Sequence, residues 1–290
     1  MRRLLDTPTA AIAYDERGHG PTIVMLPSAA HDRHDFDELR ALLASDVRTV
    51  AIDWPGHGES PPPGGPVSAM AFADIAEHVL ERLAPDGAIV LGNSVGGFSA
   101  ARAAIRRPEL VRGLVVVDGG GFAGRPLPVR AFCALMARPS FLRRIYPAFA
   151  AHYMRARTDA DRRVLAVAVA TTRSDPGLRV VSELWRSFAS PEHDLRADAP
   201  SITAPTLLVW GRRDPVIPLR VARRVRDTIP GARLVELDTG HVPHTTEPQL
   251  FAAELSRFAE RVFAGADDAA GVATADVGAG GHTGASEVAA

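Results

Sequence analysis

A serine between closely spaced glycines gives this sequence its clearest chemical signal. Ser94 lies in Gly-Asn-Ser-Val-Gly-Gly (residues 92–97), after the apolar run 88–91 and before a helix-like stretch at 98–105. Glycines two before and two after a serine allow the sharp strand-to-helix turn called a nucleophile elbow. The N–H groups at the start of the helix favour developing negative charge. The pattern predicts that Ser94 is a nucleophile; the alternative is a glycine-rich turn with a helix-capping serine.

A serine hydroxyl needs a base, and the base needs a carboxylate that orients it. In elbow folds the chain order is serine, acid, histidine. Asp214 follows the apolar run 207–210 and His241 follows the run 234–237. Both are therefore expected at the carboxyl end of a strand, where active sites of open α/β sheets gather. Asp118, at the end of the run 114–117, is the alternative acid.

Apolar runs alternate with helix-like segments along most of the chain. The predicted strands are residues 22–26, 48–52, 88–91, 114–117, 206–210 and 234–237, and the predicted helices are 37–43, 70–83, 95–106, 220–228 and 249–263. This alternation predicts an α/β fold, a mainly parallel sheet with helices on both faces. Residues 9–14 are predicted as an antiparallel edge strand.

The alternation stops between residues 123 and 198, which are helix-like and rich in Phe, Leu, Met and Arg. We predict a helical cap or lid, inserted before the acid-bearing strand and lying over the carboxyl edge of the sheet. The alternative is an ordinary helical crossover. Residues 1–122 and 199–264 then form the core. Residues 265–290 lack apolar periodicity and are predicted as a disordered tail.

Composition excludes several classes of protein. A net charge of -1 gives no basic excess for nucleic acid or a membrane surface, and 46% apolar residues are ample for a core. Cys133 is the single cysteine, so no internal disulfide is expected; we interpret it as a buried apolar residue. The N-terminus has no long apolar segment, so we expect a cytoplasmic protein. No metal or cofactor is predicted, and the oligomeric state stays open.

Four motifs of this sequence, in the order in which they occur along the chain, resemble those of the α/β-hydrolase superfamily. Besides the elbow, Trp-Gly-Arg-Arg-Asp-Pro (210–215) resembles the acid loop and Gly-His-Val-Pro-His-Thr-Thr-Glu-Pro (240–248) resembles the histidine loop. Asp-Trp-Pro-Gly-His-Gly-Glu-Ser (53–60) resembles the D-x-x-G-H-G-x-S turn. The match covers roughly residues 9–264. The resemblance implies that Ser94 is the nucleophile, His241 the base and Asp214 the orienting acid.

The resemblance also implies an oxyanion hole made from two backbone N–H groups. One belongs to Val95, and the other to the loop after the strand 22–26. Many relatives have His-Gly in that loop, whereas this chain has Pro-Ser-Ala-Ala (27–30). By register the second donor is Ala29, with Ala30 as the alternative.

Other histidines lie near these motifs. His57, in the Gly-His-Gly turn, is interpreted as structural, as in the family. His244 follows His241 by three residues and is expected to pack locally, with a role as base as the alternative. His31 and His34 follow the oxyanion loop and are expected to face solvent rather than line the pocket.

A serine nucleophile implies attack on a carbonyl group and an acyl-enzyme. The predicted function is hydrolysis of a carboxylic ester or lactone, a small and largely apolar molecule; no nucleic-acid or membrane partner is expected. Phe141 and Tyr146 of the lid are the candidate substrate contacts. The alternatives are a carbon–carbon bond hydrolase, whose glycine-rich oxyanion loop is not matched here, or a cofactor-free perhydrolase. The alternative from a different class is a non-catalytic ligand-binding member of the fold.

Overall fold

The computed structural model describes the backbone of residues 3–275 and the side chains of residues 3–264. This part of the chain contains an eight-stranded sheet in the order β1-β2-β4-β3-β5-β6-β7-β8. The strands are β1 (Arg3–Asp6), β2 (Ala11–Arg17), β3 (Thr22–Leu26), β4 (Arg48–Ile52), β5 (Ala88–Asn93), β6 (Val111–Val117), β7 (Thr206–Gly211) and β8 (Arg233–Leu237). β2 pairs antiparallel with β1 and β4, and the other neighbours are parallel.

The central strands are apolar because helices cover both faces of the sheet. Every residue of β5 and β7 is buried. The predicted bounds of β3 and β4 are confirmed. The predicted edge strand at residues 9–14 is antiparallel, but its position at the edge is wrong: β1 lies outside β2. β1 is short and largely exposed, so it carries no apolar run that the sequence analysis would detect.

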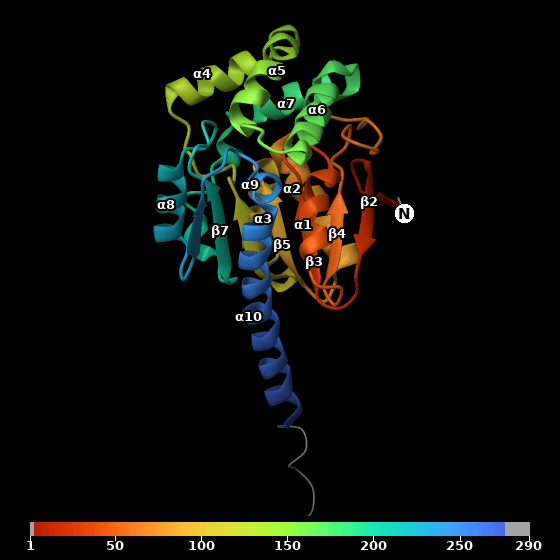
Figure 1. Cartoon of the computed structure of the whole chain (residues 1–290), viewed down its shortest axis with the longest axis vertical. Helices are drawn as coiled ribbons and strands as arrows, with labels where there is room; N and C mark the ends of the chain where they lie inside the picture. The colour runs from red at the N-terminus through yellow and green to blue at the C-terminus, as the bar shows by residue number, and fades with distance from the viewer. Residues whose placement is uncertain (1–2, 276–290) are drawn as a thin grey trace, which may run out of the picture.

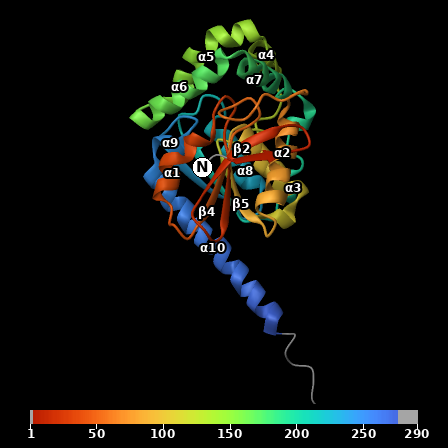
Figure 2. The same ribbon diagram turned by 90° about the vertical axis from the view of Figure 1, so that its right-hand side faces the viewer.

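Helices pack on the two faces of the sheet (Figures 1 and 2). On one face lie α1 (Asp37–Leu42), α9 (Pro243–Thr246) and α10 (Pro248–Ala275). On the other face lie α2 (Ala69–Leu83), α3 (Val95–Arg106) and α8 (Leu219–Thr228). Each face has its own apolar core, so the α/β prediction is confirmed. The short 3-10 helices are η1 (Arg33–Phe36), η2 (Pro108–Leu110), η3 (Pro191–His193) and η4 (Ala199–Ser201).

Four helices are inserted between β6 and β7 and lie above the sheet at the top of Figure 1. They are α4 (Leu127–Met136), α5 (Pro139–Met154), α6 (Asp159–Arg173) and α7 (Asp175–Ser187). We call α4–α7 the helical insertion. Its apolar core includes Ala30 and Val242, from the loops after β3 and β8. The insertion therefore packs over the carboxyl ends of the strands.

The C-terminal helix α10 runs past residue 264, where the sequence analysis placed the end of the core, and continues through Ala275. Residues 265–275 are rich in alanine, which favours helix without any apolar face to bury. The predicted disordered tail thus begins as helix, and residues 276–290 lie outside the described residues. Within residues 3–275, each helix is too short or too polar to cross a lipid bilayer.

Candidate active site

Ser94 occupies a strained turn between β5 and α3. Its backbone angles are φ 55° and ψ -113°, a region that costs a residue with a side chain roughly 1–3 kcal/mol. A Cβ at Gly96 would overlap the carbonyl oxygen of Leu26, and one at Gly92 would overlap the backbone of Gly96. The elbow therefore needs these glycines, because helix and strands approach backbone to backbone. Ser94 is the N-cap residue of α3, but its hydroxyl caps no N–H of that helix.

His241 and Asp214 form a buried hydrogen-bonded pair. His241 Nδ1 lies 2.7 Å from Asp214 Oδ2, and the two residues are 3% and 5% exposed. The other oxygen, Oδ1, accepts the N–H of Val216 at 2.7 Å. A carboxylate that accepts the Nδ1 proton fixes the ring tautomer and leaves Nε2 as the atom able to take up a proton. The partner of His241 is thus Asp214, not Asp118.

Asn93 joins the elbow to the histidine loop. Its Nδ2 group donates to the backbone oxygens of Val117 at 3.1 Å and His241 at 3.0 Å. The N–H of Ser94 also donates to Val117 O, at 3.0 Å. The residue before the serine therefore holds the backbone of His241 at the end of β5. The sequence analysis gave no such role to Asn93.

His57 fixes the loop after β3. The N–H of Ala30 donates to His57 Nε2 at 2.9 Å, so the ring proton is on Nδ1, which donates to Pro55 O at 3.0 Å. Burial lowers the pKa of His57 to about 4, so the ring stays neutral. The Ala30 N–H is therefore already engaged. The adjacent Ala29 is partly buried at the same loop.

His31 is buried, and the expectation that it faces solvent is wrong. His31 Nδ1 lies 2.6 Å from Asp35 Oδ2, and Nε2 lies 2.8 Å from the hydroxyl of Tyr153. That hydroxyl is 2.9 Å from the hydroxyl of Tyr146. A polar side chain is buried at low cost when each group finds a partner. Here one partner, Asp35, is close in sequence, and the other, Tyr153, comes from the helical insertion. His34, by contrast, is half-exposed and pairs with Asp37 at 2.8 Å.

Tyr153 connects the insertion to the loop that carries His241. Its ring meets the His241 ring edge-on, with centroids 5.5 Å apart, and its backbone oxygen accepts the His241 N–H at 2.9 Å. Of the two candidate substrate contacts, Tyr146 is buried beside Tyr153, and Phe141 is half-buried against the apolar core of the insertion. Helix α5 thus lies directly over His241.

Asp118 lies beside the pair as a second buried carboxyl. Its Oδ1 accepts the N–H of Gly211 at 3.0 Å. Burial, and then the charge of Asp214, raise the pKa of Asp118 well above its ordinary range. Ligand atoms of Asp118, Asp214 and His241 lie within 4.8 Å of one another, but both oxygens of Asp214 already accept hydrogen bonds, from His241 Nδ1 and from the Val216 N–H, so we interpret the group as a hydrogen-bonded cluster rather than a metal site. A cation there would compete with the hydrogen bond between Asp214 and His241.

Two other predicted residues lie in apolar surroundings. His244 is fully buried, stacked on Phe36 with centroids 4.9 Å apart and edge-on to Phe251 at 6.0 Å. Burial lowers the pKa of His244 to about 3. Cys133 is buried in the core of the insertion, and burial raises its pKa to about 11. Neither side chain is placed to act as base or nucleophile beside Ser94.

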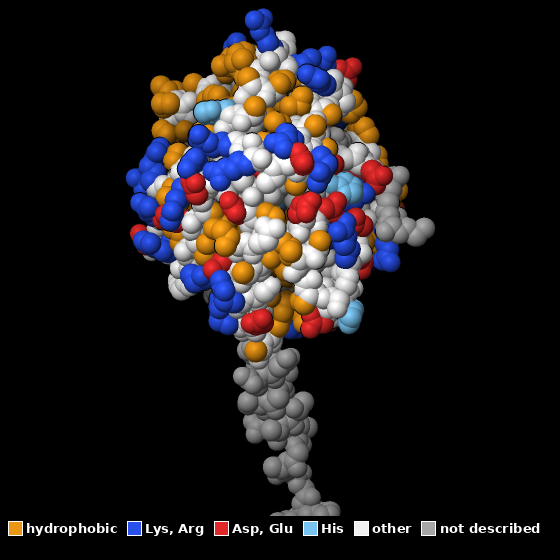
Figure 3. Space-filling view, in the orientation of Figure 1, with side chains coloured by type: hydrophobic (Ala, Val, Ile, Leu, Met, Phe, Trp, Pro, Cys, Tyr) orange, Lys and Arg blue, Asp and Glu red, His pale blue; other side chains and the backbone are white. Residues whose placement is uncertain are grey.

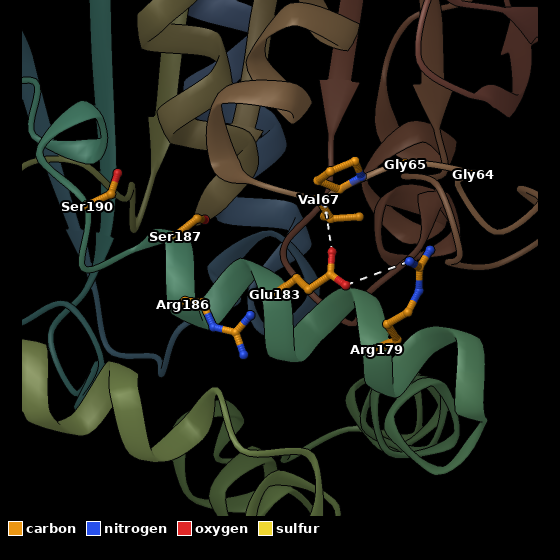
Figure 4. Close-up of a pocket in the computed structure, with 9 residues that line it drawn as sticks. Gly64, Gly65, Val67, Arg179, Glu183, Arg186, Ser187 and Ser190 are labelled. Atoms are coloured by element: carbon orange, nitrogen blue, oxygen red, sulfur yellow. Dashed lines mark hydrogen bonds and ion pairs between the residues drawn. The ribbon is translucent and has the colours of Figure 1, made fainter.

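A cavity of about 610 Å³ opens between α7 and the segment before α2 (Figure 4). Glu183 accepts the N–H of Val67 there at 2.8 Å and pairs with Arg179 at 3.7 Å. The residues that line it do not include Ser94, Asp214 or His241. This cavity lies between the insertion and the core, and the candidate catalytic residues are not part of its lining.

Comparisons with known proteins show the family to which this chain belongs. Residues 23–254 match the model of the alpha/beta hydrolase family. A pimeloyl-[acyl-carrier protein] methyl ester esterase of Shewanella woodyi is 30% identical over 73% of this chain and 83% of its own. A 2-hydroxy-6-oxononadienedioate/2-hydroxy-6-oxononatrienedioate hydrolase of a Pseudomonas species is 26% identical over 77% and 82%. The solved structure of an N-acyl homoserine lactone degrading enzyme, 25% identical, covers 88% of this chain and 100% of its own with a TM-score of 0.75. The chain belongs to the alpha/beta hydrolase family.

Proposed function

We propose that this protein is a serine hydrolase that cleaves a carboxylic ester or lactone through an acyl-enzyme. The observation that carries the proposal is the buried hydrogen bond of 2.7 Å between His241 and Asp214, at the sheet edge where the strained Ser94 turns into α3. A histidine that is oriented by an aspartate can activate the hydroxyl of a nearby serine for attack on a carbonyl. The Ser94 hydroxyl is available for this because it makes no capping hydrogen bond to the helix.

In this mechanism Ser94 Oγ attacks the carbonyl carbon while His241 Nε2 takes the hydroxyl proton. Asp214 stays ionised and stabilises the imidazolium through Nδ1. The imidazolium then protonates the leaving alkoxide, which departs as the alcohol and leaves an ester on Ser94. Water, deprotonated by His241, hydrolyses that ester and releases the acid.

The tetrahedral oxyanion requires two N–H donors. Val95 supplies the first, as the first residue of α3, where helix N–H groups have no partner within the helix. Ala29 supplies the second. The hydrogen bond that ties the Ala30 N–H to His57 supports Ala29 over Ala30.

The helical insertion acts as a lid in this proposal. Tyr146 belongs to the apolar core of the insertion, and Phe141 packs against that core. The same core includes Ala30 and Val242, in the loops after β3 and β8. Apolar side chains also gather on the outer side of the insertion over α4 (Figure 3), where Leu127 is 73% exposed. A largely apolar acyl group suits such a covering, which would exclude water from the reacting carbonyl.

The relatives leave two reactions in contention. The esterase and lactone-degrading relatives support ester or lactone cleavage, whereas the dienedioate hydrolase supports carbon–carbon bond cleavage as the second candidate. Comparing kcat/KM for p-nitrophenyl esters, simple lactones and a vinylogous 1,5-diketone discriminates them. A diketone turned over faster than every ester would select the second candidate.

Replacing Ser94 by alanine tests the proposal directly. We expect Ser94→Ala to lower kcat for an activated ester by about 10⁴- to 10⁶-fold, the usual cost of losing a triad member. A fluorophosphonate probe should label the wild type and fail to label the variant. Ser201→Ala, at an exposed serine of η4, is the control and should keep both activity and labelling. A folded Ser94→Ala with wild-type turnover would favour the non-catalytic alternative.

A further inference from the structure

Asp118 is a buried carboxyl that the triad mechanism does not use. It follows β6 with a left-handed backbone, φ 42°, which is uncommon for a residue with a side chain. Its N–H donates to Val209 O at 3.2 Å, and its Oδ1 accepts the Gly211 N–H at 3.0 Å. The turn after β6 is thus built to send this carboxyl toward the end of β7, where Asp214 follows.

The second oxygen, Asp118 Oδ2, is buried, and no N–H or O–H group of residues 3–264 donates to it. Its neighbour is the Asp214 carboxyl, itself an acceptor: a carboxylate oxygen of Asp118 and one of Asp214 lie within 4.8 Å of each other. The other titratable groups around this pair are His241 and, on the side of the insertion, Tyr153, whose phenol also feels Asp214. None of these residues is a lysine or arginine. Two adjacent buried carboxylates would repel each other without compensation.

We propose that Asp118 carries a proton on Oδ2 and donates it in a hydrogen bond to the Asp214 carboxylate, which makes Asp118 a positioning residue for the catalytic acid. This inference rests on the proposed function. Asp214 then accepts three hydrogen bonds, from the Val216 N–H, from His241 Nδ1 and from Asp118. A carboxylate has lone pairs for about four.

The shared proton has two consequences for catalysis. It locks the Asp214 carboxylate in the plane that meets His241, because groups from the loops after β6, β7 and β8 then hold its two oxygens. It also withdraws charge from Asp214, so that the proton on Nδ1 stays with the imidazole and the imidazolium is stabilised less than a bare carboxylate would stabilise it. Asp118 therefore sets the pH at which His241 becomes the free base.

The test compares Asp118→Asn with Asp118→Ala in the full chain. The acid limb of the pH profile of kcat/KM reports ionisation of the base in the free enzyme. Asparagine supplies an N–H to Asp214 and keeps an oxygen for Gly211, so we expect kcat/KM within about threefold of wild type and an unmoved limb. Alanine removes the donor, so the limb should move to higher pH and kcat should fall by about tenfold or more.

Two kinetic outcomes overturn the proposal. If Asp118 is ionised in the wild type, Asp118→Asn removes a negative charge beside His241 and the limb moves to lower pH, by about one unit or more. If the alanine and asparagine variants behave alike, the donated hydrogen bond has no role in positioning.

Infrared difference spectroscopy gives a readout that needs no turnover. We expect a carboxylic-acid carbonyl band at neutral pH in wild type and in Ser94→Ala, and its loss in Asp118→Asn. Absence of that band from the wild type overturns the proposal even where activity is normal. Loss of the proposed function would instead appear as a wild type that cleaves no ester while the band persists.

Discussion

Single residues in this molecule are buried in protonation states that the surroundings dictate. Ser94 keeps a strained backbone because Gly92 and Gly96 let the elbow close against neighbouring backbone. His57 is neutral because it must accept the Ala30 N–H, and His244 is neutral because it is buried and neither ring nitrogen finds a hydrogen-bond partner among the described residues. Such groups make stability depend on pH, because a histidine that stays neutral in the folded protein is free to ionise in the unfolded chain.

His244 gives the clearest pH prediction. Its pKa is lowered from 6.5 to about 3 on folding. At a pH below 6.5 the unfolded chain binds a proton at this histidine and the native state does not. The contribution of His244 to the free energy of unfolding is therefore complete above pH 6.5 and declines as the pH falls toward 3. At about pH 5 this loss amounts to about 2 kcal/mol relative to neutral pH. Urea unfolding of the wild type at both pH values should show it.

The matched variant is His244→Phe, which keeps a ring between Phe36 and Phe251 and removes the ionisable nitrogens. We expect the difference in free energy of unfolding between neutral and acid pH to shrink by about that amount. Among the histidines, the remaining dependence should come from His57 and His193, since burial lowers the pKa of each to about 4. An unchanged difference in His244→Phe would show that His244 is not neutral in the folded protein.

At the scale of elements, the strand–turn–helix of β5 and α3 depends on backbone contact rather than on side-chain packing. A Cβ at Gly96 would overlap the carbonyl groups of Leu26 and Pro27 at the end of β3. The same contact brings the oxyanion loop against the first turn of α3. Neither the strand nor the helix can yield, because β5 is buried throughout and paired on both sides by β3 and β6.

Gly96→Ala should therefore destabilise the protein severely, by more than about 3 kcal/mol, because rigid backbone must shift. The measurement is the urea midpoint or, where the variant does not fold, the soluble yield. Gly64→Ala is the control: a Cβ there meets nothing within 4 Å, so stability should stay within about 0.5 kcal/mol of wild type. Equal stability of the two alanine variants would mean that the backbone around Gly96 can shift at low cost to admit a Cβ.

At the scale of the whole molecule, periodicity in the sequence predicted the sheet, and motif order predicted the pair that Asp214 and His241 form. Long-range polar partners were not predictable. The chain from Asp35 through His31 to Tyr153 joins residues more than a hundred positions apart, and a lone histidine in a loop gives no sign of them. Asp118 was recognised only as a rival acid, because its nearness to Asp214 depends on the register of β6 against β7.

The helical insertion was predicted from the break in βα alternation, but its attachment to the core was not. Besides the bond from the His241 N–H to Tyr153 O, further buried or partly buried hydrogen bonds cross the seam between insertion and core. Thr246 donates to Asp161 at 3.0 Å and the N–H of Val67 to Glu183 at 2.8 Å. The N–H of Ala69 donates to Ser187 at 2.9 Å, and Tyr153 meets His31 at 2.8 Å. Contacts at both α5–α6 and α7 tie the insertion down at opposite ends.

We therefore expect insertion and core to unfold in one cooperative transition. Trp185 lies in the insertion, while Trp54 and Trp210 are fully buried in the core. The unfolding curve of Trp185→Phe reports the core, through Trp54 and Trp210. Subtracting that curve from the wild-type curve gives the fluorescence change of Trp185, which reports the insertion. In urea the two signals should share one midpoint, because breaking the seam would leave buried polar groups without partners at about 1–3 kcal/mol each.

Asp161→Ala tests the cause of that cooperativity. Asp161 is fully buried and accepts from Thr246 in α9 and from the N–H groups of Arg157 and Thr158 within the insertion. Removing this carboxylate should lower the urea midpoint of the Trp185 signal more than it lowers the midpoint of the core signal. Asp159→Ala, at an exposed aspartate on the same turn paired with Arg162, is the control and should leave both midpoints together. Separate midpoints already in the wild type would mean that the insertion opens independently, as a mobile lid over His241 rather than as part of the folded core.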